Sequence, residues 1–177
     1  MGSRTVPAAD GVYNSPESMS YLSTTFEDFF HAHRDRLFGF LCVVTANRHD
    51  AEELAQEAFL HLWERWEASG SIDDPVAYLH RTAMNAFRKR QRRASIARRL
   101  IGRPVDRLAA SPEDTVMLHE TLRGLTPRQR AALALTEWLG YTGEEAARIL
   151  GVKASTIGAL KYQARAALKE RAEQTDD

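Results

Sequence analysis

A basic stretch, Arg81-Thr-Ala-Met-Asn-Ala-Phe-Arg-Lys-Arg-Gln-Arg-Arg93, gives the strongest indication of the fold. A helix through these residues and the turn before them has a polar face and an apolar face. The polar face carries Arg81, Asn85, Arg88 and Arg92, and the apolar face carries Leu79, Ala83 and Phe87. The stretch therefore predicts a helix that packs on one side and meets an anion on the other.

Charge is unevenly distributed along the chain. Its 24 basic and 24 acidic residues give no formal net charge. From residue 81 to residue 107, however, there is one acid, Asp106, and the basic residues are Arg81, Arg88, Lys89, Arg90, Arg92, Arg93, Arg98, Arg99, Arg103 and Arg107. Such blocks indicate separate surfaces for an acidic and a basic partner, and nucleic acid fits the basic block.

Length and composition indicate a globular protein without disulfides or membrane-spanning segments. With 177 residues, 44% of them apolar, the chain can build one ordinary domain or two small ones. Cys42 is the only cysteine, so a disulfide is excluded and a buried thiol is expected. No apolar run approaches the roughly 20 residues that span a bilayer, and no signal peptide is evident. We therefore expect a cytoplasmic protein without a membrane partner.

Two amphipathic helices are expected before the basic stretch. The first carries apolar residues at helical spacing from Phe26 to Val44, with His33 packed on that stripe. The second runs from an N-cap at Asp50 to about Trp66. Its apolar stripe consists of Leu54, Ala55, Ala58, Leu62 and Trp66. Its other side is acidic, which fits either a solvated surface or a docking surface.

A turn separates the second helix from the third. Glu67-Ala-Ser-Gly-Ser-Ile-Asp-Asp-Pro75 places Asp74 as N-cap and Pro75 at the first helical position. Trp66 is expected in the core because it lies on the apolar stripe. Trp63 and Tyr78 fit either the core or a surface on which unstacked bases lie.

The second half of the chain has the pattern of a helix-turn-helix. Residues 94–111 read as a basic linker, and Ser111-Pro112 restarts helix formation. Thr142 can cap a helix that ends before Gly151, and a further helix carries Ile157, Leu160, Ala164 and Leu168 on its inner face. In a helix-turn-helix the second helix enters the DNA major groove. The pattern by itself fits an ordinary pair of packed helices equally well.

Taken together, these elements resemble the extracytoplasmic-function type of bacterial sigma factor, a promoter-recognition subunit of RNA polymerase. The resemblance covers about residues 26–169. It rests on Asp50-Ala-Glu-Glu-Leu-Ala-Gln-Glu-Ala-Phe-Leu-His-Leu-Trp63, on Pro75-Val-Ala-Tyr-Leu-His-Arg-Thr-Ala-Met-Asn85, and on Leu125-Thr-Pro-Arg-Gln-Arg130 with Gly151-Val and Thr156-Ile. Their order and spacing together are specific.

The resemblance implies a role for each surface. The acidic helix would dock on the clamp coiled coil of core RNA polymerase through Glu53, Gln56 and Glu57. The loop from Trp66 to Asp74 would hold a flipped base of the minus-ten element. Residues implied at that element are Trp63, Tyr78, Arg81, Asn85, Arg88, Lys89, Arg92 and Arg93. Of these, Arg88, Lys89, Arg92 and Arg93 would hold phosphates. Those implied at the minus-thirty-five element are Lys153, Ser155, Thr156, Ala159, Tyr162, Gln163 and Arg165, with Lys169 near phosphate.

Some positions depart from the family pattern. Tyr78 stands where the family usually has tryptophan, and Gly158 and Leu160 replace positions that are commonly polar or basic. Lys153 is a poor N-cap, and Gly158 inside a helix costs about 1 kcal/mol relative to alanine.

We therefore expect an all-α protein of two small helical domains. The expected divisions are an N-terminal tail (1–24), a region 2-like domain (25–93), a basic linker (94–111), a region 4-like helix-turn-helix domain (112–170) and a C-terminal tail (171–177). The resemblance implies three partners: core polymerase through its clamp and flap, promoter DNA, and an anti-sigma protein. We expect no homo-oligomer.

The sequence also leaves a second function open. A stand-alone helix-turn-helix regulator would bind duplex DNA without polymerase, usually as a two-fold dimer. No catalytic residues, metal ligands or cofactor are expected, because the chain has neither a phosphate-cradling glycine loop nor paired cysteines.

Overall fold

The computed structural model describes residues 25–69, 72–101, 122 and 124–175, and all regular structure in them is helical. The helices are α1 (Phe26–Thr45), α2 (Arg48–Ser69), α3 (Pro75–Ile101), α5 (Pro127–Leu133), η2 (Ala134–Trp138), α6 (Gly143–Leu150) and α7 (Ala154–Thr175). We call α1–α3 the N-terminal bundle and α5–α7 with η2 the C-terminal bundle. The expectation of an all-α fold is confirmed.

The N-terminal bundle is built on the three apolar stripes read from the sequence. On α1 the buried residues include Phe29, Leu37, Leu41 and Val44, and on α2 the whole expected stripe is buried. The ring of Phe29 lies 5.5 Å from that of Trp66 and 4.3 Å from that of His33. The expected core positions of Trp66 and His33 are thus confirmed. Cys42 is half-buried, and burial raises the pKa of its thiol.

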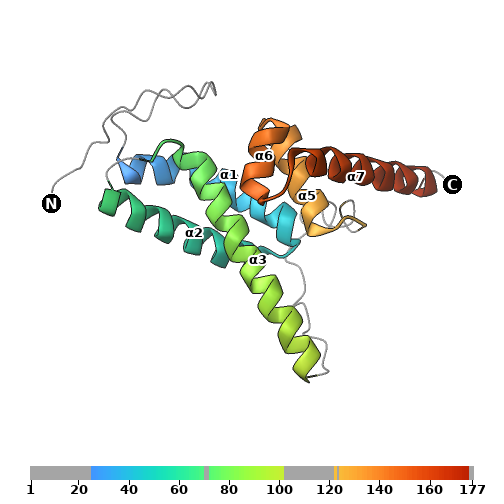
Figure 1. Cartoon of the computed structure of the whole chain (residues 1–177), viewed down its shortest axis with the longest axis horizontal. Coiled ribbons are helices and arrows are strands. Elements are labelled where there is room, and N and C mark those ends of the chain that lie inside the picture. The colour runs from blue at the N-terminus through green and yellow to red at the C-terminus, as the bar shows by residue number, and fades with distance from the viewer. Residues whose placement is uncertain (1–24, 70–71, 102–121, 123, 176–177) are drawn as a thin grey trace.

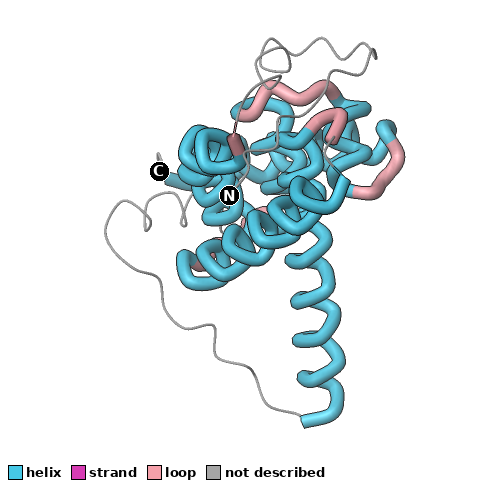
Figure 2. The backbone as a smooth tube through the Cα atoms, turned by 90° about the vertical axis from the view of Figure 1, so that its left-hand side faces the viewer, coloured by secondary structure: helices cyan, strands magenta, loops and turns pink. Residues whose placement is uncertain are grey.

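Two helices differ from the sequence-based expectation in where they begin or end. The Oδ1 atom of Asn47 accepts a hydrogen bond from the Asp50 backbone N–H at 2.9 Å, so α2 begins three residues earlier than expected. Helix α3 continues to Ile101 instead of ending near Arg93. Its last turns therefore project away from both bundles (Figures 1 and 2). The start of α3 is as expected, with Asp74 accepting from the Ala77 N–H at 2.8 Å.

The C-terminal bundle contains the expected helix-turn-helix. Thr142 caps α6 with a capping box closed by Glu145. Gly151 ends α6 in the left-handed conformation at φ 60°, which an L-residue adopts only at a cost. Ile157 and Ala164 of α7 are buried, whereas Leu160 is only partly buried. The expected restart at Ser111-Pro112 lies outside the described residues.

The two bundles pack directly against each other and share one apolar core. Helix α5 lies against α1, and α6 lies against α3 (Figure 1). The Arg130 side chain, 7% exposed, donates from Nη2 to the Val44 carbonyl near the end of α1 at 2.9 Å. Arg88 donates from Nη1 to the Leu150 carbonyl at the end of α6 at 2.8 Å. Each bundle therefore supplies an arginine to a helix C-terminus of the other.

His80 lies at this junction, with 3% of its surface exposed. Its Nδ1 atom lies 2.9 Å from the Val76 carbonyl and 3.2 Å from the Tyr141 hydroxyl, so the proton belongs on Nδ1. Its Nε2 atom is buried and has no hydrogen-bond partner among the described residues. Burial, with smaller contributions from His33 and Arg36, lowers the pKa of His80 from 6.5 to about 4.

We predict that acid destabilises the fold through His80. Because its pKa is lower in the folded chain, the unfolded chain binds the extra proton, and stability is lost as pH falls from 6.5 towards 4. The full loss is about 3 kcal/mol at 1.36 kcal/mol per pH unit. Urea unfolding across this range measures it. His80→Gln, which does not titrate, should show a flatter pH dependence, and equal dependence in both proteins would contradict the assignment.

Candidate nucleic-acid interface

Helix α3 presents the basic face expected from the sequence. Leu79, Ala83 and Phe87 are buried against the rest of the bundle. The opposite side is exposed at Arg81, Asn85, Lys89, Arg92 and Arg93. Core packing thus fixes which way the basic side chains point, and the result is a surface suited to an extended polyanion.

Arg88 differs from the other basic residues of this face because it is only half-exposed. Its guanidinium donates from Nε to the Met84 carbonyl at 3.2 Å, from Nη1 to the Leu150 carbonyl and from Nη2 to the Asn85 side chain. Burial, together with the charge of Arg128, lowers its pKa. The partner on α6 was not predictable, because it lies 62 residues further along the chain.

The two aromatic residues left open by the sequence take different positions. Trp63 is 47% exposed on α2, which is high for so large a side chain. Tyr78 is half-buried, and the Arg81 guanidinium lies over its ring at 5.6 Å. Trp63 lies outside the core and Tyr78 packs partly against it, so both rings remain accessible in part for stacking.

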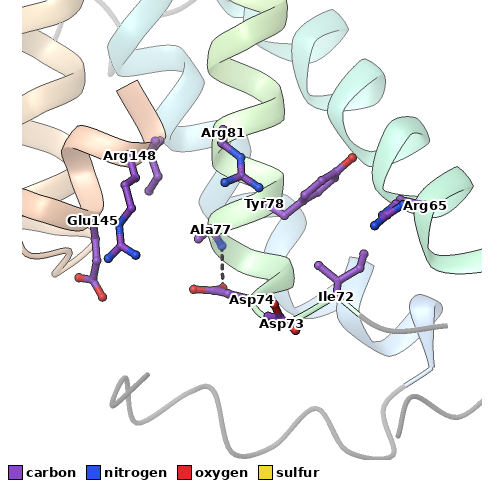
Figure 3. A pocket seen from close by; sticks show the side chains of 10 residues that line it. Arg65, Ile72, Asp73, Asp74, Ala77, Tyr78, Arg81, Glu145 and Arg148 are labelled. Carbon is purple, nitrogen blue, oxygen red and sulfur yellow. Dashed lines mark hydrogen bonds between the residues drawn. The ribbon is translucent and has the colours of Figure 1, made fainter. Parts of the chain in front are cut away.

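A pocket of about 330 Å³ lies beside Tyr78 and Arg81 (Figure 3). One wall comes from the end of α2, the loop before α3 and the first turns of α3, and includes Arg65. The other comes from α6, which contributes Glu145 and Arg148. The loop from Trp66 to Asp74 reaches this pocket through Ile72, Asp73 and Asp74, while residues 70 and 71 lie outside the described chain.

The acidic side of α2 divides into exposed and ion-paired positions. Gln56 and Glu57 are exposed. Glu53 pairs with Arg90 of α3, and this hydrogen bond is the main reason that the pKa of Glu53 is lowered. Arg90 also lies 3.4 Å from Asp50. Of the three implied docking residues, Glu53 is thus already paired within the bundle, which sequence reasoning missed because Arg90 lies 37 residues away.

The exposed side of α7 carries the residues implied for the upstream element. Ser155, Ala159, Gln163 and Arg165 are exposed, Tyr162 is 77% exposed, Thr156 is half-buried, and Lys153 is exposed just before the helix. The inner face packs through Ile157 and Ala164. Among the described residues, an alanine Cβ at Gly158 would meet nothing within 4 Å. Packing in this part of the chain therefore does not require the glycine.

Glu137 is a residue that sequence reasoning missed. It lies in the π-helical turn η2, and its Oε1 atom is 2.8 Å from both the Lys161 and the Arg165 side chains of α7. These partners, Lys161 foremost, lower the pKa of Glu137. No local pattern signals the contact, because the partners lie 24 or more residues away. Glu137 thus neutralises part of the positive charge of α7.

In the part of the chain that the structure describes, no three His, Cys, Asp or Glu side chains are grouped to hold a metal ion. None of the helices described has the length and hydropathy to cross a membrane.

Comparison with known proteins places two family models on the chain. Sigma-70 region 2 matches residues 29–96, and Sigma-70, region 4 matches residues 115–168. The RNA polymerase sigma-E factor of Streptomyces avermitilis is 28% identical over 155 residues, covering 85% of this chain and 87% of that protein. The ECF RNA polymerase sigma factor SigM of Mycobacterium tuberculosis is 31% identical over 147 residues, covering 81% and 74%.

A solved structure also matches most of the chain. It is the sigma factor RpoE in complex with the anti-sigma factor NepR from Bartonella quintana, with a TM-score of 0.70 and 24% identity. The match covers 84% of this chain and 96% of that one. At this identity the likeness bears on the fold.

We predict that Glu137→Gln strengthens the binding of the chain to duplex DNA by about two- to fivefold, the range of an exposed ion pair. The substitution releases Lys161 and Arg165 for phosphates. Fluorescence anisotropy with a labelled duplex measures the change. Glu144→Gln, at an exposed position of α6, alters the net charge equally and is the control. Equal effects of both substitutions would contradict a specific role for Glu137.

Proposed function

We propose, since the chain belongs to the extracytoplasmic-function family of RNA polymerase sigma factors, that its two bundles hold the two elements of a promoter. As a member of this family, the chain binds core RNA polymerase and directs promoter-specific initiation. The resemblance inferred from the sequence is confirmed. Family membership disfavours the stand-alone regulator.

The observation that carries the proposal is the two-sided helix α3. Its apolar side is fixed in the core, and its basic side is exposed from Arg81 to Arg93. We assign Arg81 and Asn85 to base or sugar contacts at the minus-ten element, and Arg88, Lys89, Arg92 and Arg93 to phosphates. Trp63, Tyr78 and the pocket beside them are assigned to unstacked bases, whose extrusion costs a few kcal/mol that stacking offsets. Binding without covalent chemistry is then enough to nucleate melting.

We assign the upstream, minus-thirty-five element to α7. We assign Tyr162 and Gln163, with their exposed neighbours on α7, to base edges in a major groove, and Arg165 and Lys169 to phosphates. The open space around Gly158 allows a DNA backbone to come close to this helix. The domain boundaries 25–93 and 112–170 are proposed on the same basis as these roles.

Core polymerase is assigned to the acidic side of α2. Gln56 and Glu57 are exposed, and the Glu57 carboxylate lies 4.0 Å from the His61 ring, so this acidic face favours encounter with a basic coiled coil. To contact polymerase, Glu53 would have to break its ion pair with Arg90 or keep that pair while binding the coiled coil as well. We further propose a flap contact through the C-terminal bundle, an anti-sigma protein as inhibitor, as RpoE has in NepR, and action in the cytoplasm.

We predict that Gln56→Ala with Glu57→Lys weakens core binding about tenfold, or about 1.4 kcal/mol, while the fold is kept. Titration of labelled chain with core polymerase measures this, and promoter-specific transcription in vitro should fall in parallel. Glu170→Lys makes the same charge change on an exposed part of α7 and is the control. Unchanged core affinity would contradict the docking assignment. Absence of any promoter-specific transcript from the unaltered chain would contradict the function.

We predict that Arg88→Gln with Arg92→Gln makes promoter binding by the holoenzyme less sensitive to salt. Each phosphate contact to a single strand adds about 0.7 to the slope of log affinity against log salt, so two lost contacts lower the slope by about 1.4. Binding is measured at several salt concentrations. Arg34→Gln, an exposed arginine of α1, should leave the slope unchanged. A slope that stays the same in the double variant would refute the phosphate assignment.

A further inference from the structure

We propose that Gln129 of α5 is a positioning residue for base recognition by α7. It orients the side-chain amide of Gln163 so that this amide offers a hydrogen-bond donor to the DNA. At the position of the minus-thirty-five element that Gln163 contacts, guanine or thymine is then selected over adenine or cytosine. The inference rests on the proposed function, because it concerns how the helix assigned to this element distinguishes bases.

The Gln129 side chain is held by the N-terminal cap of α5. Thr126 is the N-cap residue, and Gln129 closes the capping box with it. The Thr126 backbone N–H donates to Gln129 Oε1 at 2.7 Å, and the Gln129 N–H donates to the Thr126 hydroxyl at 3.3 Å. A backbone N–H can only donate, so the oxygen of the Gln129 amide faces the cap. The NH2 group of the same amide is therefore available to a partner outside the cap.

That partner is Gln163, because α5 packs against α7 (Figure 1). The Gln129 Nε2 group donates to Gln163 Oε1 at 3.4 Å. An amide NH2 donates and does not accept, so Gln163 has to turn its oxygen towards α5. Its own NH2 group is left to donate to another acceptor. At 3.4 Å the hydrogen bond is long, so it favours one orientation of the Gln163 amide without locking it.

Few other side chains on the exposed face of α7 can distinguish one base from another. Gly158 has no side chain, and Ala159 offers only a methyl group. Ser155 and Tyr162 carry hydroxyls, which both donate and accept and therefore fit either kind of base edge. The two ends of the Gln163 amide differ chemically, so the orientation of this amide decides which base it selects.

The major groove separates the bases into two classes that match the two ends of an amide. Guanine and thymine present a carbonyl oxygen there, whereas adenine and cytosine present an amino group. The usual pairing of glutamine with adenine needs the amide oxygen as well as the NH2 group. In Gln163 the oxygen is directed towards Gln129, so the NH2 group approaches the base. Guanine fits best, because its O6 and N7 atoms accept both hydrogens, and thymine comes second with O4 alone.

Gln129→Glu tests the proposal, because it keeps the cap and removes the donor. Glutamate closes a capping box as glutamine does, and an acid in the first turn of a helix is favourable, so the fold should be kept. The new carboxylate cannot donate and accepts from the Gln163 NH2 group instead. The Gln163 amide then turns its oxygen to the DNA. The preferred base should change to adenine or cytosine at this one position.

The measurement is selection of DNA by the holoenzyme, which is the full chain bound to core polymerase. Promoter-length duplexes of random sequence are offered, and the bound fraction is sequenced for each variant. Gln163→Ala identifies the position that Gln163 contacts, because the preference is lost there. Ala172→Glu is the control for charge, since it adds one negative charge at an exposed position near the end of α7. A thermal unfolding curve shows that each variant is folded.

A second measurement needs no change at Gln129. In a duplex with a guanine–cytosine pair at the identified position, 7-deazaguanine, which has carbon in place of N7, replaces guanine in one strand or the other. Binding of the unaltered holoenzyme should weaken in the strand that Gln163 contacts, because one acceptor of its NH2 group is gone. The Gln129→Glu holoenzyme should not respond, since it presents an acceptor itself.

We expect the unaltered holoenzyme to prefer guanine or thymine at this position by about two- to tenfold, the range of one neutral hydrogen bond. Gln129→Glu should invert the preference by a similar factor and leave the other positions unchanged. Ala172→Glu should leave every base preference unchanged. If Gln129→Glu does not fold, the 7-deazaguanine measurement decides.

Three results overturn the proposal. The first is that Gln163→Ala changes no base preference, and the second is that folded Gln129→Glu keeps the preference of the unaltered chain. The third is that 7-deazaguanine weakens binding in neither strand. Failure of the proposed function has a different result, in which the unaltered holoenzyme selects no sequence and makes no promoter-specific transcript. A holoenzyme that selects promoters, yet whose preference does not depend on Gln129, keeps the function and loses the positioning role.

Discussion

The arrangement of this molecule depends on the unpaired carbonyl groups at two helix ends. Helix α1 ends at Thr45 and α6 at Leu150, and each would leave carbonyls to water if it stood alone. Here Val44 and Leu150 each receive an arginine from the opposite bundle. Because a guanidinium is planar and always charged, it satisfies such a carbonyl with a defined geometry. The two bundles are therefore placed by the same chemistry that ends their helices.

A chain without net charge can carry strong local electric fields where like charges cluster. Acidic residues of this chain limit those fields by pairing with some of the basic residues. Glu53 and Asp50 hold Arg90, whereas Glu137 holds Lys161 and Arg165. These exposed pairs contribute little stability, since solvent screens them. Their effect is on the surfaces themselves: they decide which basic side chains remain available to a polyanion. The basic residues after Arg90 lie on the end of α3 that projects from the rest of the molecule (Figure 1), whereas Lys161 and Arg165 of α7 are paired with Glu137.

What the sequence predicts well is what depends on neighbours within one helix. The stripe from Leu54 to Trp66, the cap at Thr142 and the stop at Gly151 each follow from spacing over a few residues, and each is confirmed. Errors occur where two local signals compete, as at Asn47, which caps α2 in place of Asp50. Contacts such as Arg88 with Leu150 are invisible to spacing, because partners 62 residues apart meet only after both bundles have formed.

The junction between the bundles combines polar contacts that can exchange partners with apolar packing that cannot. If Val44 and Leu150 lost their arginines, both carbonyls would gain water, so each lost hydrogen bond would be largely replaced. The apolar side chains have no such replacement, because both bundles contribute to one apolar core and separation would expose it to water. The polar contacts therefore fix the relative placement of the bundles, while the apolar packing keeps them together.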